Sequence, residues 1–389
     1  MIDRSLFDEI HDRRNSNSVK YNSGPARNNK SVIPMWIADM DFKSPAEVEK
    51  AIVDAASQGI YGYEGVGSEY DTLIKNWYKK RMGWEISDKR LLNSPGVMFS
   101  VAAAIRALSD PGDAVMIFQP VYYPFANTVK ANNRKLVISD LVRNEEGCYG
   151  IDFNDMEDRI RKEKVKILLF CSPHNPVGRV WKDWELKSVA DICTRNNVKI
   201  ISDEIHSDFI LKGKHIPMAA VSKEAESITV TCVSPTKTFN LAGLNVSSIV
   251  VDEPDMRTAV KKELNATSFW GVNMMGAAAS NAAYGYGEEW LDMLLDYLRD
   301  NVELLSEAFP EGSVITHVDQ EGTYLSWLDC RNMGVDEPAS LILEKTGVWL
   351  HEGSVFGDSG KGYVRMNIAC PRSVLKEACS RIQKEFMCV

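Results

Sequence analysis

Residues 166–203 read KILLFCSPHNPVGRVWKDWELKSVADICTRNNVKIISD, two short apolar runs with a helical pattern between them. The first and last six residues of this stretch are almost continuously apolar, which is typical of strands covered on both faces of a parallel sheet. Between them, Leu186, Val189, Ala190 and Cys193 recur at helical spacing. The stretch therefore predicts a strand–helix–strand unit.

The same alternation extends through the middle of the chain. Further apolar runs of strand length occur at 113–118, 135–139, 228–233 and 246–251. Strands that alternate with helical segments indicate an α/β domain with a mainly parallel sheet. Earlier in the chain, residues 44–59 predict a helix in which Ser44 is the N-cap, Pro45 takes the first helical position and Glu47 closes a capping box.

The last third of the chain has a different rhythm. Residues 288–309 form a long amphipathic pattern, a few short strands follow, and residues 371–386 predict a terminal helix. The chain has 389 residues, more than one ordinary core requires. We therefore expect a large α/β domain at 50–285 and a smaller domain built from 1–49 together with 286–389.

Composition and charge argue against several classes of protein. Hydrophobic residues make up 44% and charged residues 25% of the chain, as in folded, soluble proteins. The net charge of −9 and the pI near 5.4 argue against a nucleic-acid or anionic-membrane surface. The charged N-terminal segment resembles neither a signal peptide nor a membrane span. The eight cysteines form no CxxC pair, so we expect no metal site, reduced thiols and a cytoplasmic location.

Functional side chains follow three of the predicted strands. Asn175 lies in SPHNPVG after the first, Asp203 ends the second in SDEIH, and Lys237 follows the third in TCVSPTKTFNLAGL. Taken alone, each has an ordinary explanation as a turn residue, a helix cap or a solvated surface lysine. Because ligands bind at the carboxyl ends of parallel strands, we expect the three side chains to share one site.

An amine, a carboxylate and an amide at one spot suit pyridoxal phosphate chemistry. The amine of Lys237 can bind the cofactor aldehyde covalently, and a buried Asp203 can hold the ring nitrogen protonated, so that the ring acts as an electron sink. Asn175 can donate a hydrogen bond to the phenolic oxygen of the ring.

The cofactor phosphate needs N–H and O–H donors, which a helix N-terminus supplies. Residues 93–108, NSPGVMFSVAAAIRAL, contain a glycine turn that runs straight into a helix, and its first amides belong to Val97 and Met98. Ser234 adds a hydroxyl three residues before Lys237. We expect these groups to hold the phosphate.

At this point the chain resembles a known family along its whole length. HNPVG, SDEIH and SPTKTFNLAGL resemble, in the same order, the fingerprints of the aspartate-aminotransferase fold family of pyridoxal phosphate enzymes. Within it, PMWIADMDF at 34–42, YGY at 61–63 and PVYYPF at 120–125 resemble the cystathionine β-lyase type of carbon–sulfur lyases, the MalY/PatB group. The resemblance implies a mostly parallel seven-stranded sheet in the large domain and a smaller α+β domain.

The resemblance also implies roles for individual residues around the cofactor. Lys237 matches the lysine that binds the cofactor, Asp203 the partner of the ring nitrogen and Asn175 the donor to the ring oxygen. Tyr122 matches the aromatic residue that stacks on the ring, with neighbouring Tyr123 as the alternative.

Further matches concern the substrate, the second subunit and the phosphate. Arg365 matches the arginine that binds the substrate α-carboxylate, and Tyr63 matches a tyrosine that reaches the phosphate of the neighbouring subunit and so implies a homodimer. Two positions depart from the family pattern: His206 stands where many relatives have a tyrosine, which leaves its role open, and Asn245 stands where the broader aminotransferases carry a phosphate-binding arginine.

These matches predict β-elimination from an L-cysteine S-conjugate such as L-cystathionine, which yields pyruvate, ammonia and a thiol. In this expectation Arg365 holds the carboxylate and Lys237 removes the Cα proton. The alternatives are a class I/II amino-acid aminotransferase, which shares these residues up to loss of the Cα proton, and a non-catalytic regulator. The sequence leaves open which S-conjugate is the natural substrate.

Overall fold

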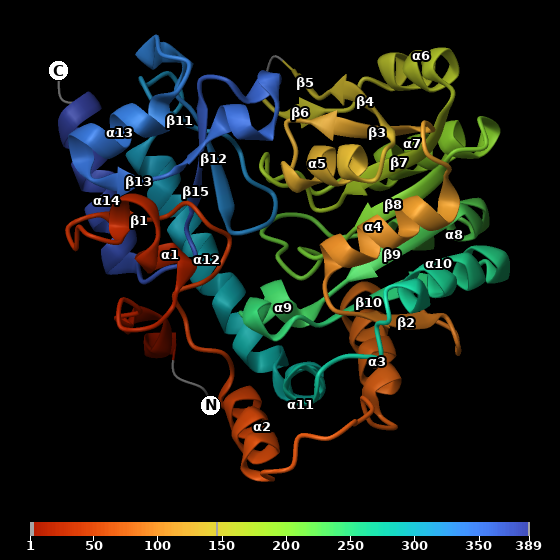
Figure 1. Cartoon of the computed structure of the whole chain (residues 1–389). Coiled ribbons are helices and arrows are strands. Elements are labelled where there is room, and N and C mark those ends of the chain that lie inside the picture. The colour runs from red at the N-terminus through yellow and green to blue at the C-terminus, as the bar shows by residue number, and fades with distance from the viewer. Residues whose placement is uncertain (1–3, 145–146, 388–389) are drawn as a thin grey trace.

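The computed structural model describes residues 4–144 and 147–387 and shows a large and a small lobe (Figure 1). The large lobe contains a seven-stranded sheet in the order β2-β10-β9-β8-β7-β3-β4. The strands are β2 (Leu91–Ser94), β3 (Ala114–Gln119), β4 (Lys135–Asp140), β7 (Val165–Cys171), β8 (Lys199–Asp203), β9 (Thr229–Val233) and β10 (Ser247–Val251). The run from β9 to β4 is parallel, whereas β10 is antiparallel to both of its neighbours.

The sheet confirms the predicted strands to within one or two residues and adds one that the sequence did not indicate. That strand is β2, which lies at the edge of the sheet and pairs only with β10. Three of its four residues are only half-buried, so it lacks the continuous apolar run of the inner strands. The sheet is therefore mostly parallel and seven-stranded, as the family resemblance implied.

Helices cover both faces of the sheet, and this explains the apolar runs. Alternate strand residues such as Val115 and Ile117 pack against α4 (Val97–Leu108), α5 (Pro124–Ala131) and α10 (Pro254–Ala266). The residues between them, such as Met116 and Phe118, pack against α6 (Phe153–Glu163), α7 (Asp183–Arg195) and α8 (Lys223–Ile228). Because successive side chains of a strand point to opposite faces, strands covered on both sides need apolar residues throughout.

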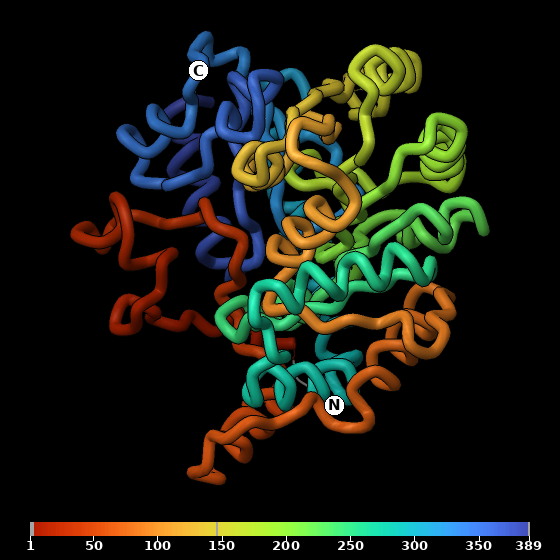
Figure 2. The backbone as a smooth tube through the Cα atoms, turned by 45° about the vertical axis from the view of Figure 1, so that its right-hand side comes forward, coloured from red at the N-terminus to blue at the C-terminus, as the bar shows by residue number. Residues whose placement is uncertain are grey.

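The small lobe is built on a four-stranded antiparallel sheet in the order β11-β12-β15-β14. Its elements are β11 (Thr316–His317), β12 (Leu325–Asp329), β14 (His351–Glu352), β15 (Tyr363–Asn367), α12 (Glu288–Ala308), α13 (Pro338–Thr346) and α14 (Arg372–Phe386). The long helix and the terminal helix confirm the two predicted from the sequence. In the N-terminal segment, β1 (Ile33–Pro34) pairs in parallel with β13 (Val348–Trp349), and Figure 2 shows this segment beside the C-terminal third.

Further helices, a hairpin and several 3₁₀ turns complete the fold. They are α1 (Val19–Asn22), α2 (Ala46–Ser57), α3 (Tyr70–Met82), α9 (Pro235–Thr238), α11 (Met274–Tyr286), the hairpin of β5 (Val142–Arg143) and β6 (Tyr149–Gly150), and 3₁₀ turns at 4–8, 24–26, 218–220, 242–244, 331–333, 353–356 and 358–360. The division of the chain into 50–285 and the remainder stays a prediction. Its first boundary falls inside α2, which packs against α11.

The predicted capping of α2 was wrong. The helix begins at Ala46, Pro45 is the N-cap residue and no side chain caps the first turn. The Ser44 hydroxyl instead donates to the carbonyl oxygen of Phe239 at 2.8 Å. A tertiary acceptor therefore replaces the local capping bond that the sequence pattern predicted.

The helices and the cysteines bear on the expected location of the protein. Within residues 4–144 and 147–387, no helix is both long and apolar enough to cross a bilayer. The seven cysteines in the described part of the chain are unpaired thiols, and Cys388 lies outside it. The cytoplasmic location stays a prediction.

Candidate active site

The three predicted strand ends meet at one edge of the sheet. In the strand register, Cys171 at the end of β7 pairs with Asp203 of β8, which pairs in turn with Cys232 of β9. A cavity of about 290 Å³ opens there. Its lining comprises Ala38, Val97, Met98, Tyr122, Cys171, Asn175, Asp203, Ile205, His206, Lys237, Ala242 and Asn245. Residues that lie far apart in the sequence are thus brought together, as the strand order predicted.

Lys237 lies in α9, a single helical turn directly after β9. Its Nζ donates to the carbonyl oxygen of Ala38. Burial lowers the pKa of the Lys237 amine to about 8, although the nearby carboxylates of Asp39 and Asp203 act in the opposite direction. The amine is therefore closer to its neutral, nucleophilic form than a surface lysine would be.

Asp203 is the last residue of β8 and is only 5% exposed. Its Oδ1 accepts a hydrogen bond from the backbone N–H of Ile205 at 3.1 Å. Burial raises the pKa of the Asp203 carboxyl to about 7. A buried carboxylate with so little compensation suits a cationic partner, and the protonated ring nitrogen of pyridoxal phosphate is such a partner. The site therefore fits this cofactor.

Arg365, on β15 of the small lobe, does not itself line the cavity but contacts Asn175, which does. Its Nη1 donates to Asn175 Oδ1 at 3.0 Å, which leaves the amide NH₂ of Asn175 as the group available to a ligand. Its Nη2 donates to the carbonyl oxygen of Trp36 at 2.9 Å and contacts His351 Nδ1 at 3.2 Å. Its buried Nε has no hydrogen-bond partner among the described residues.

The environment of Arg365 also favours an anion. Burial lowers the pKa of its guanidinium to about 10, and its hydrogen-bond partners among the described residues are an amide, a backbone carbonyl and an imidazole, with no carboxylate. A buried guanidinium with an unpaired N–H is unfavourable unless an anion joins it. The substrate α-carboxylate would satisfy both the charge and the free donor.

The structure separates the two neighbouring tyrosines. Tyr122 lines the cavity, and its backbone N–H donates to the carbonyl oxygen of Asn175 at 3.0 Å. Burial raises the pKa of the Tyr122 hydroxyl to about 12. Tyr123 is 39% exposed and does not line this cavity; its ring contacts those of His351 and Phe356. Tyr122 is therefore the residue of the pair that faces the cavity.

The predicted phosphate donors are placed unequally. Val97 and Met98, at the N-terminus of α4, line the cavity. The Ser234 hydroxyl donates to the carbonyl oxygen of Val246 at 2.6 Å and caps α9 by accepting from the N–H of Thr236 at 3.1 Å. A phosphate contact by Ser234 stays a prediction, and it requires this hydroxyl to leave Val246.

Two other predicted residues lie at opposite extremes of burial. His206 lines the cavity, and its buried Nδ1 has no hydrogen-bond partner among the described residues. Burial lowers the pKa of this imidazole to about 3, so it is neutral at neutral pH. Tyr63 is 97% exposed; its ring contacts that of Trp270 and it does not line the cavity of its own chain.

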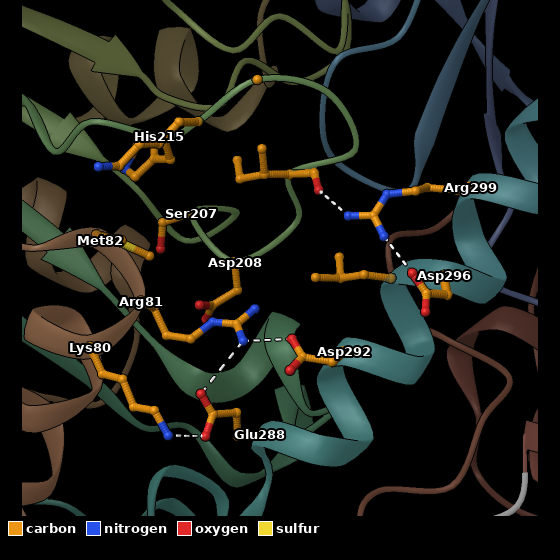
Figure 3. Close-up of a pocket in the computed structure, with 14 residues that line it drawn as sticks. Lys80, Arg81, Met82, Ser207, Asp208, His215, Glu288, Asp292, Asp296 and Arg299 are labelled. Carbon is orange, nitrogen blue, oxygen red and sulfur yellow. Dashed lines mark hydrogen bonds and ion pairs between the residues drawn. The ribbon is translucent and has the colours of Figure 1, made fainter.

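A larger depression of about 540 Å³ lies elsewhere, between α3, the segment 207–215 and α12 (Figure 3). Its charged side chains are largely paired with one another: Arg81 contacts Asp292 at 2.6 Å, and Arg299 contacts Asp296 at 2.6 Å. It lacks the combination of an amine with a depressed pKa and an uncompensated carboxylate. The smaller cavity is therefore the candidate active site.

Sequence reasoning missed the contribution of Ala38. Its carbonyl oxygen accepts from Lys237 Nζ and from the Tyr324 hydroxyl, the latter at 3.2 Å. No side-chain pattern indicates a role for a backbone oxygen. The only signal in the sequence was the WIADMDF motif, which contains this residue.

Comparison with known proteins identifies the family of the chain. The family described as aminotransferase class I and II matches residues 30–382 of the chain. The chain belongs to this family.

Relatives within the family include carbon–sulfur lyases. The chain is 34% identical to cystathionine β-lyase PatB of Bacillus subtilis, over 97% of this chain and 98% of that protein. The pyridoxal-phosphate-containing structure of cystalysin from Treponema denticola has a TM-score of 0.93 at 35% identity and covers 97% of this chain and 98% of its own. A pyridoxal-phosphate-bound carbon–sulfur lyase from Staphylococcus hominis has a TM-score of 0.90 at 34% identity, with 98% of each chain covered.

Proposed function

We propose that the chain is a pyridoxal-phosphate-dependent carbon–sulfur β-lyase that cleaves L-cystathionine or a related L-cysteine S-conjugate. The observation that carries the proposal is the convergence of Lys237, Asp203 and Asn175 in one cavity, together with the guanidinium of Arg365, which contacts Asn175 and keeps an unpaired Nε–H. Full-length similarity to cystathionine β-lyase supports the reaction type.

Each cofactor contact has a candidate among the residues of the cavity. Lys237 would bind the cofactor covalently, Asp203 would pair with the ring nitrogen and the Asn175 amide would donate to the ring oxygen. Tyr122 would stack on the ring, and the first amides of α4 would bind the phosphate. When bound, pyridoxal phosphate supplies an electron sink for the pair left on the substrate Cα.

In the elimination, Arg365 would bind the substrate and Lys237 would transfer the proton. Arg365 binds the substrate carboxylate and so fixes the position of Cα. The substrate amine would displace Lys237 from its covalent bond, and the freed amine of Lys237 would take the Cα proton. A Cα–Cβ double bond would form as the Cβ–S bond breaks, and the electron pair would leave with the sulfur. The protonated lysine can return the proton to the thiolate. The released aminoacrylate reacts with water to give pyruvate and ammonia.

Incubation with L-cystathionine tests the proposal. We expect pyruvate and free thiol to form in equal amounts without an added keto acid, because the electron pair leaves with sulfur instead of being protonated on the cofactor. The matched control is the cystathionine analogue that lacks the α-carboxylate of its cysteine half, which should react far more slowly because Arg365 then has no carboxylate to bind next to the reacting Cα. A requirement for 2-oxoglutarate as acceptor would instead identify an aminotransferase, and reaction of the analogue at the same rate would rule out the role of Arg365.

We also propose that the protein works as a homodimer in which Tyr63 completes the partner's phosphate site. The segment after α2 projects from the molecule in both views (Figure 1, Figure 2). It carries the exposed apolar side chains Ile60, Tyr61 and Tyr63, and Trp270 lies against Tyr63. Several exposed large apolar side chains on one projection are typical of a protein interface.

Mixing two inactive variants tests the shared site. The Tyr63→Ala and Lys237→Ala proteins should each have little activity, yet a mixture that exchanges subunits should recover up to about a quarter of the wild-type activity. The recovery arises because each mixed dimer contains one site with an intact Lys237 and an intact Tyr63. Recovery should be absent when Lys237→Ala is mixed with a variant that carries both changes. A lack of recovery despite subunit exchange, shown by differently tagged chains, would contradict the shared site.

A further inference from the structure

The segment Trp36–Phe42 runs between the two cations of the active site. The carbonyl oxygen of Trp36 accepts from Arg365 Nη2 at 2.9 Å, and that of Ala38 accepts from Lys237 Nζ. One short stretch of backbone therefore contacts both the residue assigned to the substrate carboxylate and the residue assigned to proton transfer. The position of this segment bears directly on the reaction.

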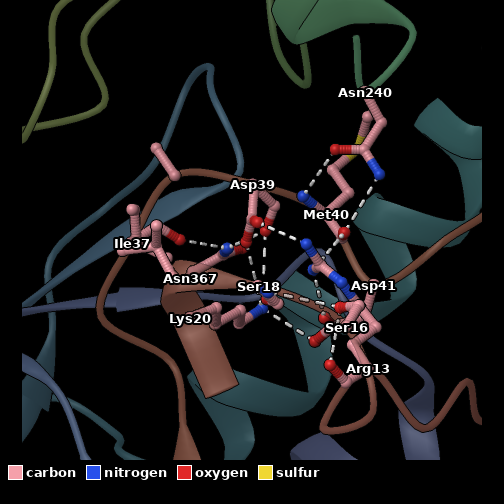
Figure 4. Close-up of polar contacts among 12 residues, drawn as sticks. Arg13, Ser16, Ser18, Lys20, Ile37, Asp39, Met40, Asp41, Asn240 and Asn367 are labelled. Atoms are coloured by element: carbon pink, nitrogen blue, oxygen red, sulfur yellow. Dashed lines mark hydrogen bonds and ion pairs between the residues drawn. The ribbon is translucent and has the colours of Figure 1, made fainter. Parts of the chain in front are cut away.

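Two asparagines hold the segment from either side (Figure 4). Asn240, three residues after Lys237, accepts from the N–H of Met40 at 3.1 Å and donates to the carbonyl oxygens of Met40 at 3.0 Å and Phe42 at 2.9 Å. Asn367, two residues after Arg365, donates to the carbonyl oxygens of Ile37 at 2.7 Å and Asp39 at 2.6 Å. The segment is thus bound to both of the elements that carry the active-site cations.

Ion pairs of Asp39 and Asp41 with two cations also hold the 36–42 segment in place. Asp39 Oδ2 accepts from Arg13 Nη2 at 2.7 Å, while Asp41 accepts from Arg13 Nη1 at 3.1 Å and from Lys20 Nζ at 2.7 Å. Lys20 is 1% exposed and Asp41 6%. Two cations and two carboxylates balance in charge, which buried ionic groups require.

The two carboxylates of this cluster are not equivalent. Asp41 bonds directly to both cations, and its backbone N–H donates to Ala369. Asp39 has one oxygen on Arg13, whereas its buried Oδ1 accepts no hydrogen bond among the described residues and has the ammonium of Lys20 only at 3.8 Å. Asp39 is also the neighbour of Ala38, whose carbonyl oxygen contacts Lys237.

The charged groups that face Lys237 come from separate parts of the fold. Burial lowers the pKa of the Lys237 amine; Asp39 from the 36–42 segment raises it, Arg365 from β15 lowers it and Asp203 from β8 raises it. Asp39 and Asp203 are therefore the two carboxylates that favour the charged amine, Asp39 the more strongly, and Asp203 is already assigned to the cofactor ring.

We propose that Asp39 is a positioning residue for the elimination: anchored by Arg13, it keeps the Ala38 carbonyl against Lys237 and places a fixed negative charge beside the nitrogen that gains and loses protons. This inference rests on the proposed role of Lys237. It assigns to the WIADMDF motif a task that the cofactor and substrate contacts leave unexplained.

The test compares Asp39→Asn with Asp41→Asn in the cofactor-loaded enzyme. The readouts are the pH midpoint of the visible absorbance change, the pH profile of kcat/KM, and Tm. Loss of the Asp39 charge should move the midpoint to lower pH by roughly half a unit or more, because the cationic form of the nitrogen loses a favourable partner. Asp41→Asn removes a charge from the same cluster, so it should lower Tm while leaving the midpoint close to that of the wild type.

Arg13→Gln tests the same charge effect in a protein that retains Asp39, and it can be measured even if Asp39→Asn does not fold. Arg13→Gln leaves Asp39 in place but removes a cation that compensates it, so the midpoint should move to higher pH. Shifts of opposite sign distinguish an electrostatic role from simple loosening of the segment. An unchanged midpoint in both Asp39→Asn and Arg13→Gln, or an equal shift in Asp41→Asn, would overturn the inference. A wild-type protein without a visible absorbance change or lyase activity would instead reject the proposed function.

Discussion

Replacing Lys237 with alanine is expected to lower kcat for the elimination by roughly 10⁴-fold or more, because one amine supplies both the covalent attachment of the cofactor and the base that removes the Cα proton. The cavity offers no second amine, since Lys237 is the only lysine that lines it among the described residues. Steady-state kinetics with L-cystathionine measures the loss.

A second measurement on the same variant separates the covalent role from activity. Treatment of the wild-type protein with borohydride should leave the cofactor attached to the peptide that contains Lys237, as mass spectrometry can show. The alanine variant should release all cofactor on denaturation. The matched control is Lys187→Ala, which removes an exposed lysine on α7 whose partner is Asp183. If the Lys237→Ala protein still retains the cofactor covalently after reduction, the assignment of this lysine is wrong.

Replacing Asp203 with asparagine is expected to lower kcat by roughly 10²–10³-fold, the usual cost of removing one preorganised charge that stabilises a transition state. Burial raises the pKa of the Asp203 carboxyl to about 7. A cationic partner would stabilise its ionised form. Asparagine fills the same space but cannot keep the ring nitrogen protonated. Kinetics and the absorbance spectrum of the loaded enzyme provide the readouts.

Asp208 provides the control for Asp203. It is another buried aspartate of the segment after β8, and it accepts hydrogen bonds from the indole of Trp77 at 3.0 Å and the hydroxyl of Thr238 at 2.7 Å. Asp208→Asn should therefore reduce Tm without changing the cofactor spectrum. Equal losses of kcat in the two variants, or an unchanged kcat in Asp203→Asn, would contradict a specific role for Asp203 at the ring nitrogen.

Most of the large lobe could be predicted because its strands are buried on both faces. Burial on two sides demands a continuous apolar run, and such runs are visible in the sequence without knowledge of their partners. The exceptions follow from the same cause. Three of the four residues of β2 are only half-buried at the sheet edge, and the antiparallel direction of β10 depends on connections that no apolar pattern records.

In the candidate site too, some features could be predicted from the sequence and others could not. Lys237, Asp203 and Asn175 were predicted to share a site because each lies at or just after the end of a strand, and neighbouring parallel strands end at one edge of the sheet. The hydrogen bonding of Ser234 was not predictable, because the carbonyl oxygen that accepts its proton belongs to Val246 on the approach to β10. The choice between Tyr122 and Tyr123 likewise required the direction of two adjacent side chains.

The sequence by itself determined the chemical groups of this protein: the amine, the carboxylate, the amide and the guanidinium, and the strand ends that bring the first three together. Only the tertiary structure decided what surrounds the amine. Ala38 and Lys237 are 199 positions apart, and their contact depends on a backbone oxygen that every residue has. A side chain is written in the sequence, whereas the partner of a backbone carbonyl depends on which distant segments cross in the folded chain.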